Sequence, residues 1–300
     1  MKNNLNNINL EIEVTNKCNF NCSYCCANAV TSNELDFRQL KYFLKYLFKI
    51  SKNNFQIIIT GGEPFLYKNL NDLLLFLNNN NKVIGINLLT NLSKINDLSV
   101  FNKYSKLNFI LSSIHKEYYN YYLKNIKYYK KIIKYLCDKK IHIEFNVLLE
   151  KFENYDINQL DKLKKIIYEF KSIGKNLNFL TFNAQFITFG NILDNIESKN
   201  KTKFEKFLNI KFNSYFNEFK DITKFEENNF NFNGWFCRPR NFMIKYNGNI
   251  TRDCGSFPVI GNIKNFKDAK NIVIKTIKCN EEKCNPQISG DIERWKSYKG

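Results

Sequence analysis

The sequence predicts an α/β fold in which six strands alternate with helices, followed by a smaller C-terminal α+β domain. Two observations predict the alternation: short runs rich in β-branched residues recur along the chain, and segments with helical spacing of apolar residues separate them. Alternation of this kind favours a parallel sheet, whose functional groups gather at the carboxyl ends of the strands. The expected strands are Leu10–Thr15, Gln56–Thr60, Val83–Thr90, Leu107–Ile114, Ile141–Leu149 and Leu177–Ala184.

Helical spacing is clearest in Phe37–Ile50 and Tyr118–Cys137. A third stretch, Thr202–Phe225, repeats Phe, Tyr and Leu near helical spacing, so we expect a helix there that packs over the mouth of the strand repeats. Domain sizes then follow as residues 1–185 for the repeats, 186–233 for a helical bridge and 234–300 for the C-terminal domain.

Three cysteines, Cys18, Cys22 and Cys25, follow the first expected strand at CxxxCxxC spacing. Three thiolates leave one iron of a 4Fe-4S cluster open, so that the cluster can bind and activate a small molecule. Structural zinc is the alternative, but it usually needs four N or S ligands as two short pairs, and no second pair lies near this loop. Cys26 could be a fourth ligand only with awkward geometry. The spacing therefore favours an iron–sulfur cluster.

A glycine-rich turn, Thr60-Gly-Gly-Glu-Pro64, follows the second expected strand. Its two glycines let the backbone approach a ligand closely, and its carboxylate is fixed before a proline. Such a turn suits an ammonium group.

With CxxxCx(aromatic)C after the first strand and a GGEP turn after the second, the chain resembles the radical S-adenosylmethionine (radical SAM) superfamily. The resemblance implies a partial (β/α)6 barrel, a cluster whose open iron binds S-adenosylmethionine, and its reductive cleavage to a 5'-deoxyadenosyl radical that abstracts a hydrogen atom. It also implies a flavodoxin- or ferredoxin-type electron donor. The residues assigned in this way are Cys18, Cys22 and Cys25 to the cluster, Tyr24 to the adenine, and Gly61, Gly62, Glu63 and Pro64 to the methionine amino end.

Polar residues at other strand ends are further candidates. Thr90 and Asn91 resemble the tip that family members use near the ribose or sulfonium of S-adenosylmethionine. Ser113 and His115 resemble their Ser-x-Asp or Ser-x-His tip, and Asn146 is another candidate cofactor contact. The alternative is that such residues only end strands through local hydrogen bonds. His115, one of two histidines, could be a general acid or a substrate contact, although Asp is commoner at its position.

A hairpin is predicted near the C-terminus, where Phe242–Tyr246 and Asn249–Arg252 flank an Asn-Gly pair typical of a type I′ turn. A hairpin returns the chain to its start, so we expect Cys237 and Cys254 to meet at its open end.

Four C-terminal cysteines, Cys237, Cys254, Cys279 and Cys284, can then close one site. The arrangement over Gly234–Asn285 resembles the twitch extension of radical SAM enzymes, a short form of the SPASM domain, which implies an auxiliary 4Fe-4S cluster. The four-residue gap between the last two cysteines departs from the commoner gap of two. A zinc ribbon is the alternative, and disulfides are disfavoured because nothing marks an oxidising compartment.

Two cysteines remain. Cys26 could donate a hydrogen atom to a substrate radical, but a small buried thiol is the simpler interpretation. We expect Cys137, near the end of a helical stretch, to be a packing residue.

The chain has a net charge of +18, which would suit a polyanionic partner. However, Lys, Asn and Ile are used in place of other residues throughout, so most lysines are expected to form solvated helix faces and nucleic acid is disfavoured as a substrate. Residues 1–9 lack the apolar core of a secretory signal and no stretch is apolar enough for a membrane span, so a cytoplasmic and anaerobic setting is expected.

Three functions are compatible with these patterns. The first is a radical SAM enzyme that oxidises a small molecule or sugar with the help of an auxiliary 4Fe-4S cluster, and the closed four-cysteine site favours it. The second is a radical SAM enzyme that epimerises or crosslinks a ribosomal precursor peptide. The third is a basic binding module with zinc sites and no catalytic role.

Overall fold

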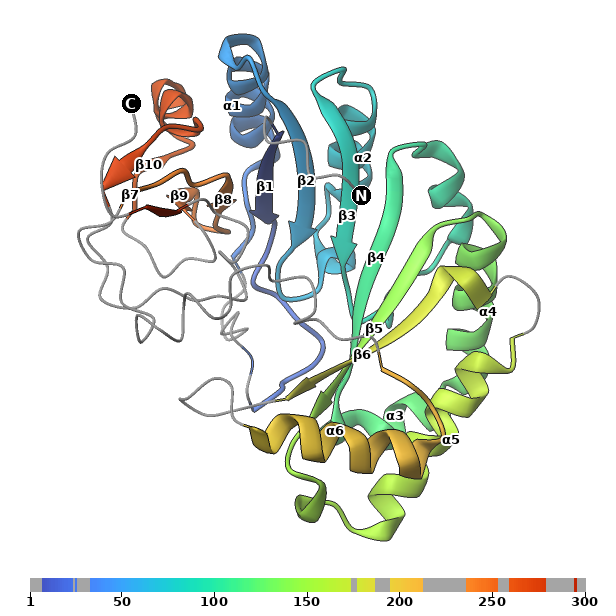
Figure 1. The fold of residues 1–300 in the computed structure, drawn as a ribbon. Coiled ribbons are helices and arrows are strands. Elements are labelled where there is room, and N and C mark those ends of the chain that lie inside the picture. The colour runs from blue at the N-terminus through green and yellow to red at the C-terminus, as the bar shows by residue number, and fades with distance from the viewer. Residues whose placement is uncertain are drawn as a thin grey trace. The chain divides into compact units, whose positions relative to one another are not determined.

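The structure is a computed structural model that describes residues 7–23, 25, 33–173, 177–186, 195–212, 236–252, 259–278 and 294–295 (Figure 1). The chain divides into two compact units. The first contains residues 1–18, 29–86 and 216–300, and the second contains residues 19–28 and 87–215. Strand β3 (Val83–Leu89) is divided between them. The three predicted domains stay a prediction.

In the first unit, the sheet has the strand order β10-β9-β8-β1-β2-β3, and a small second sheet has the order β11-β7-β12. Strand β1 pairs in parallel with β2 on one side and with β8 on the other. The elements are β1 (Asn7–Glu13), α1 (Phe37–Ile50), β2 (Asn54–Thr60), the 3-10 helix η1 (Pro64–Leu66), α2 (Leu70–Asn78), β7 (Phe236–Cys237), β8 (Asn241–Ile244), β9 (Asn249–Arg252), β10 (Gly261–Asn262), the 3-10 helix η7 (Phe266–Asn271), β11 (Ile277–Lys278) and β12 (Arg294–Trp295).

Side chains alternate between the two faces of β1 and β2, and one face is apolar and buried. Every second residue of each strand is apolar and fully buried: Ile8, Leu10 and Ile12 in β1, and Phe55, Ile57 and Ile59 in β2. Helix α1 covers this face, and its Phe48 ring lies 5.1 Å from the ring of Phe55. The helix begins at Asp36, whose carboxylate accepts a hydrogen bond from the Gln39 N–H.

In the second unit, the sheet has the order β3-β4-β5-β6, and β4, β5 and β6 pair in parallel. Aromatic residues form its core: Phe145 of β5 lies 5.0 Å from Phe170 of α5 and 5.7 Å from Phe182 of β6, measured between ring centroids. The elements are the 3-10 helix η2 (Leu98–Lys103), β4 (Leu107–Ile114), η3 (Lys116–Tyr118), α3 (Tyr119–Lys124), α4 (Ile126–Asp138), β5 (His142–Leu149), η4 (Phe152–Asn154), α5 (Ile157–Lys171), η5 (Leu177–Phe179), β6 (Leu180–Phe186) and α6 (Asn195–Leu208).

The other face of β5 and β6 is polar. His142 Nε2 lies 2.9 Å from Thr181 Oγ1, which also donates to Glu144 at 3.5 Å. Two residues further along both strands, the buried side chains of Asn146 and Asn183 lie side by side in register. We call the side chains of His142, Glu144, Asn146, Thr181 and Asn183, with the β4 side chains in register beside them, the polar face.

The α/β class with a parallel sheet and all six predicted strands are confirmed, with small shifts at their ends. The predicted helix Phe37–Ile50 has the predicted bounds, whereas Tyr118–Cys137 forms the two helices α3 and α4, which are separated at Asn125. The first three residues of Leu177–Ala184 form a 3-10 helix rather than a strand.

The helix predicted over Thr202–Phe225 is wrong in its bounds. Helix α6 begins at Asn195 and ends at Leu208, because Asn209 adopts a left-handed conformation with φ of 53°. Phe204 of α6 lies 4.9 Å from Phe152, in the segment that follows β5. Residues 213–225 lie outside the described residues.

The hairpin of β8 and β9 is confirmed, but its predicted type I′ turn is wrong. Lys245 N–H donates to Asn249 O, and Gly248 N–H donates to Lys245 O, at 2.8 and 2.7 Å. Gly248 has a φ of 86°, whereas Asn247 is not among the residues with positive φ. A type I′ turn needs positive φ at both positions, so this is a three-residue loop in which glycine alone takes the left-handed conformation.

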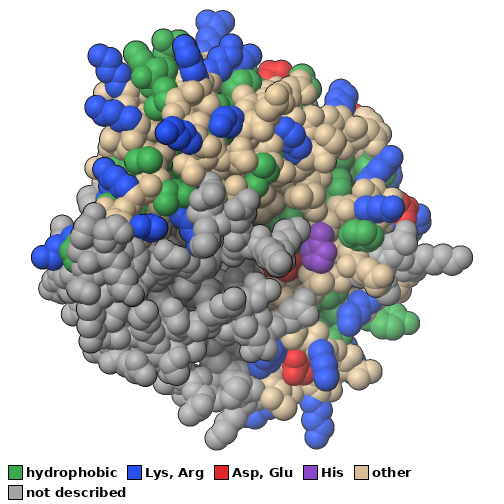
Figure 2. Space-filling view, turned by 45° about the horizontal axis from the view of Figure 1, so that its top comes forward, with side chains coloured by type: hydrophobic (Ala, Val, Ile, Leu, Met, Phe, Trp, Pro, Cys, Tyr) green, Lys and Arg blue, Asp and Glu red, His purple; other side chains and the backbone are tan. Residues whose placement is uncertain are grey.

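Lys and Arg side chains are scattered over the visible surface rather than gathered into one patch (Figure 2). Among the described helices, none is both long enough and apolar enough to cross a membrane.

Candidate active site at the carboxyl ends of the strands

The chain that leads into Cys18 is held against the glycine-rich turn. Gly62 N–H donates to Thr15 O at 2.8 Å, and Glu63 N–H donates to Lys17 O at 2.7 Å. A Cβ on Gly61 would lie 2.4 Å from Thr15 O, and one on Gly62 would lie 2.2 Å from Lys17 O. The close approach that requires glycine is therefore to the backbone before Cys18, while the predicted contact of this turn with a ligand stays a prediction.

The carboxylate of Glu63 is fully buried and held in place by the turn that follows it. One of its oxygens accepts a hydrogen bond from Phe65 N–H at 3.0 Å, which caps the 3-10 helix η1. Pro64 is the first residue of that helix, where its missing N–H costs nothing.

The three cysteines of the CxxxCxxC motif are partly exposed and form no disulfide. Cys25 N–H donates to Cys22 O at 3.1 Å, which closes a tight turn between these two. Within the described ranges, no three His, Cys, Asp or Glu side chains are gathered as a metal site. The chemistry of the donors nevertheless fits a 4Fe-4S cluster, since three thiols that form no disulfide stand on one short loop.

Thr90 and Asn91 make local hydrogen bonds at the end of β3, as expected if such residues end strands. Thr90 Oγ1 accepts from Leu92 N–H at 3.0 Å, and Asn91 Oδ1 accepts from Ser93 N–H at 2.9 Å. Asn91 does more, because its amide donates to Asn19 Oδ1 at 3.2 Å, and Asn19 in turn donates to Ser93 Oγ at 2.8 Å. Asn91 thus anchors a residue of the cysteine motif. Sequence spacing did not indicate Asn19 or Ser93.

Ser113 and Asn146 are neighbours in register on β4 and β5, and Asn183 of β6 extends the row. Asn183 Nδ2 donates to Asn146 Oδ1 at 3.5 Å. Asn183 Oδ1 is buried and accepts no hydrogen bond from any residue that the structure describes. A buried acceptor of this kind is costly unless a ligand satisfies it. Sequence reasoning missed Asn183, although an Asn near the carboxyl end of the sixth strand was the available signal.

His115 is partly buried, and desolvation lowers its pKa to about 4, with a smaller opposing effect from Glu117. Its ring meets Phe20 and Tyr118 edge-on, at 6.3 Å from each ring centroid. The imidazole is therefore neutral near pH 7. Its predicted role as a general acid or a substrate contact stays a prediction.

Cys137 is buried in α4, and burial raises the pKa of its thiol to about 11, in agreement with a packing role. Cys237 is partly exposed in β7 and forms no disulfide. Other predicted site residues lie outside the described residues, namely Tyr24, Cys26, Cys254, Cys279 and Cys284.

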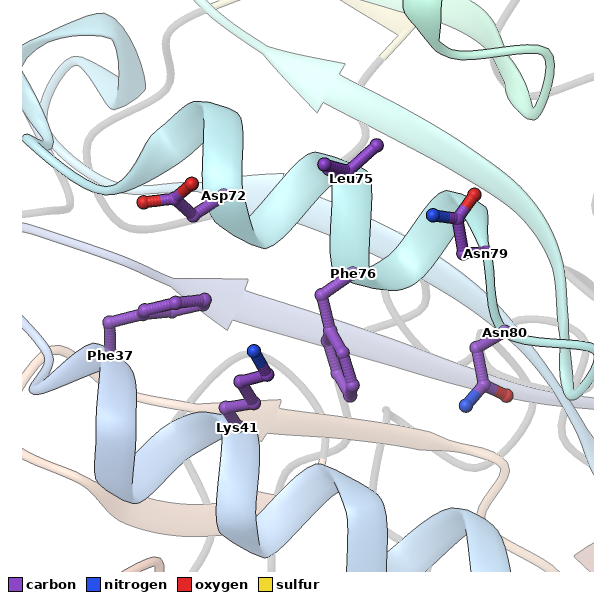
Figure 3. Close-up of a pocket in the computed structure, with 7 residues that line it drawn as sticks. All are labelled: Phe37, Lys41, Asp72, Leu75, Phe76, Asn79 and Asn80. Carbon is purple, nitrogen blue, oxygen red and sulfur yellow. The ribbon is translucent and has the colours of Figure 1, made fainter.

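A separate cavity of about 440 Å³ lies between α1 and α2 in the first unit (Figure 3). Lys41 Nζ lies 5.5 Å from the ring centroid of Phe37 and 5.8 Å from that of Phe76. None of the predicted site residues lines it. Its lining residues are Phe37, Lys41, Asp72, Leu75, Phe76, Asn79 and Asn80.

A profile of the radical SAM superfamily matches residues 12–182, which include both motifs. The chain belongs to the radical SAM superfamily. Its parallel strands and intervening helices are those of the partial barrel of this family. The radical SAM family implies a 4Fe-4S cluster and S-adenosylmethionine as cofactors and supports an enzyme.

Curated relatives match parts of the chain. A GTP 3',8-cyclase of Staphylococcus haemolyticus (strain JCSC1435) is 29% identical over 211 residues, which cover 63% of this chain and 61% of that protein. An uncharacterised protein of Methanocaldococcus jannaschii is 44% identical over 61 residues, or 20% of this chain and 21% of the other. The chain thus spans less than two thirds of the length of these relatives.

Solved structures of low identity share the fold. Streptococcus suis SuiB bound to S-adenosylmethionine matches with a TM-score of 0.53 and 16% identity, covering 87% of this chain and 63% of SuiB. Native anSMEcpe with bound AdoMet and the Cp18Cys peptide matches with a TM-score of 0.53 and 20% identity, covering 88% of this chain and 80% of the other.

Proposed function

We propose that this radical SAM enzyme abstracts a hydrogen atom from a small molecule or sugar and completes an oxidation with an auxiliary 4Fe-4S cluster. One observation supports the radical SAM part of this proposal. The turn at Gly61–Pro64 holds the backbone just before Cys18 and so positions the cysteine motif. When bound, the cluster supplies the electron that cleaves S-adenosylmethionine into methionine and a 5'-deoxyadenosyl radical.

The roles of the chain's residues follow from their places. Cys18, Cys22 and Cys25 hold the cluster. The turn Gly61–Pro64 lies against the backbone that enters the motif, where it would hold the methionine amino end. Asn146 and Asn183 offer amide groups on the polar face, where the unsatisfied Asn183 Oδ1 can accept a hydrogen bond from a substrate hydroxyl or amine.

The charge of the strands favours a substrate without phosphate groups. No residue of β1, β2, β3, β4, β5, β6 or β8 is Lys or Arg, although the chain carries 46 of them. The same strands carry Glu11, Glu13 and Glu144. Phosphate groups are usually bound by Arg, Lys or metal ions. A neutral or amine-bearing molecule therefore suits the strands better than the nucleotide in the name of the cyclase relatives.

Two of the cations beside the strand ends form ion pairs within the protein. Lys17 Nζ lies 2.8 Å from a carboxylate oxygen of Glu34, and Lys116 Nζ lies 3.4 Å from one of Glu150. Because each of these two lysines is paired with a carboxylate, neither is available to bind a phosphate group. This also supports a substrate of neutral or positive charge.

The second half of the proposal rests on the C-terminal cysteines Cys237, Cys254, Cys279 and Cys284, which we propose hold the auxiliary cluster that takes the second electron of the oxidation. The alternative for this site is zinc. If zinc also replaces the first cluster, the chain is the basic binding module without a catalytic role.

Peptide modification is the second candidate function. Two similar folds have peptide ligands in their names, the Cp18Cys peptide of anSMEcpe and the precursor peptide SuiA of SuiB. Backbone amide groups would also suit the uncharged Asn146 and Asn183, so the polar face fits a peptide as well as a sugar.

Counting iron and sulfide after anaerobic purification tests the proposal. Two clusters require about eight irons and eight sulfides per chain, and one requires about four. A colourless protein with zinc and no acid-labile sulfide would overturn the radical SAM function. The triple variant C18S/C22S/C25S should lose all reductive cleavage of S-adenosylmethionine while the absorbance of the C-terminal cluster remains. Persistent cleavage would show that the first motif is wrongly assigned.

A further inference from the structure

We propose that Glu117 and Tyr118 are positioning residues that hold the CxxxCxxC loop in shape for its cluster. The inference rests on the proposed function, because it requires a cluster at Cys18, Cys22 and Cys25. All contacts that carry it lie within the second unit, between residues 19–25 and the segment from η3 to α3 that follows β4.

Phe20 is the aromatic anchor of the loop. It stands midway between Cys18 and Cys22, it is only 5% exposed, and its ring stacks on Tyr118 with centroids 3.9 Å apart and planes 7° apart. The ring of Tyr121 meets it edge-on at 5.3 Å. Burial of an aromatic ring of this size dominates the energetics of a short loop. The middle of the motif is thus fixed to η3 by packing.

Backbone hydrogen bonds fix the rest of the loop to the same element. Asn21 N–H donates to the Tyr118 hydroxyl. Ser23 N–H donates to both carboxylate oxygens of Glu117 at 3.3 Å each. Two neighbouring residues of η3 therefore bind alternate N–H groups on the two sides of Cys22.

The element that holds the loop is itself anchored. Tyr118 N–H donates to His115 O at 3.0 Å, and the Tyr122 hydroxyl donates to Ser113 O of β4 at 2.8 Å. Lys116, between them, donates to Asn154 O at 3.0 Å. The loop is therefore tied, through η3 and α3, to strand β4 of the sheet.

Fixing the loop before the cluster arrives reduces the entropy lost when the cluster binds. Ordering a residue's backbone costs free energy, so a loop already held at Phe20, Asn21 and Ser23 should keep its cluster longer. The carboxylate of Glu117 has a second effect, because negative charge beside a cluster disfavours its reduced and more negative form. Removing that charge should raise the reduction potential.

The rate at which a ferrous chelator removes iron tests the first effect. Y118F keeps the ring but loses the acceptor of Asn21 N–H, and Y118L loses both. We expect iron loss from the cluster whose EPR spectrum responds to S-adenosylmethionine to be several-fold faster in Y118L and intermediate in Y118F. The control is Y135F, which removes another tyrosine hydroxyl of this unit, bonded to Asn102 at 2.9 Å.

Wild-type rates of iron loss in both Tyr118 variants would overturn the proposal. If circular dichroism shows that Y118L does not fold, Y118F alone decides, because it retains the stacked ring.

The reduction potential tests the second effect. E117Q keeps an oxygen that can accept from Ser23 N–H but removes the charge, so the potential of the same cluster should rise. E169Q is the control, since Glu169 pairs with Lys130 on the helices of this unit at 2.7 Å. An unchanged potential in E117Q would contradict the charge effect.

Failure of this inference is distinguishable from failure of the proposed function. A wild-type protein without iron and sulfide would remove both. A wild-type protein with a normal cluster, and variants that match it in chelation rate and potential, would remove only the roles of Glu117 and Tyr118.

Discussion

At the residue scale, Gly62 shows how one missing side chain positions the cysteine motif. A Cβ there would lie 2.2 Å from the Lys17 carbonyl oxygen, which belongs to the backbone and cannot rotate away. We expect G62A to lower the free energy of unfolding by about 1–3 kcal/mol and to reduce the cluster content, because the chain before Cys18 must shift. Thermal unfolding and iron analysis measure the two effects.

Gly85 provides a matched control for this substitution. Its Cβ would also be crowded, at 2.6 Å, but by the end of the flexible Gln56 side chain. G85A should therefore be milder and should leave the cluster content unchanged. Equal effects of G62A and G85A would mean that the contact with Lys17 does not position the motif.

A partly buried histidine predicts acid sensitivity. Burial lowers the pKa of His115 from 6.5 to about 4, so the unfolded state binds more protons between these values. Stability contributed by the neutral ring is present above about pH 6.5 and is lost as the pH falls toward 4, in total about 3 kcal/mol. H115F, which keeps an aromatic ring beside Phe20, should weaken this pH dependence. Unfolding midpoints at pH 7.5 and pH 5 test it, and identical pH dependence in both proteins would contradict it.

At the scale of elements, the β8–β9 loop depends on one glycine. Gly248 has a φ of 86°, so G248A should destabilise the hairpin by about 1–2 kcal/mol. N247D keeps an oxygen that can accept from Asn249 N–H, now bonded at 3.0 Å, and should change stability by less than about 0.5 kcal/mol. Thermal unfolding of the two variants measures the difference. A larger loss in N247D than in G248A would favour the type I′ turn.

Local patterns predicted the elements well where one rule was decisive. Helix α1 was found with its bounds because its apolar spacing is clear, and the strands were found from their β-branched residues. The end of α6 was missed because Phe212 continues the apolar spacing beyond the left-handed Asn209, although the helix has already ended. The hairpin turn was misassigned because an Asn-Gly pair suits two loop lengths.

The site was predictable only where its residues are neighbours in sequence. The cysteine motif and the glycine-rich turn each indicate their chemistry from spacing alone. The contacts of Glu117 and Tyr118 with the cysteine loop were not predictable from the sequence. Ser23 and Glu117 are 94 residues apart and meet only in the folded chain. Asn19 and Asn91 were missed as a pair for the same reason.

At the scale of the whole molecule, Cys18 and Cys237 belong to chain segments that flank opposite ends of one pair of strands. Strand β8 runs parallel to β1, with Asn241 beside Asn9 and Ile244 beside Ile12. Cys237 therefore precedes the amino end of this pairing, whereas Cys18 follows its carboxyl end. Three residue steps of this paired strand span about 10 Å, a separation that favours different clusters for Cys18 and Cys237.

This arrangement predicts that the two clusters can be removed separately. C237A should lower the iron content by about four per chain while reductive cleavage of S-adenosylmethionine continues. Anaerobic iron analysis and detection of 5'-deoxyadenosine measure the two results. Loss of cleavage together with the iron, in a protein that still folds, would show that the C-terminal cysteines serve the first cluster.

The pairing of β1 with β8 also constrains the order in which the chain can assemble. Asn9 donates a side-chain hydrogen bond to Asn241, 232 residues later, so this edge of β1 lacks its β8 partner until residues 241–244 have left the ribosome. Until then its backbone N–H and C=O groups form an open edge that could pair with another nascent chain. Contacts so distant in sequence also form slowly. The C-terminal hairpin thus protects the newborn N-terminal strand from aggregation.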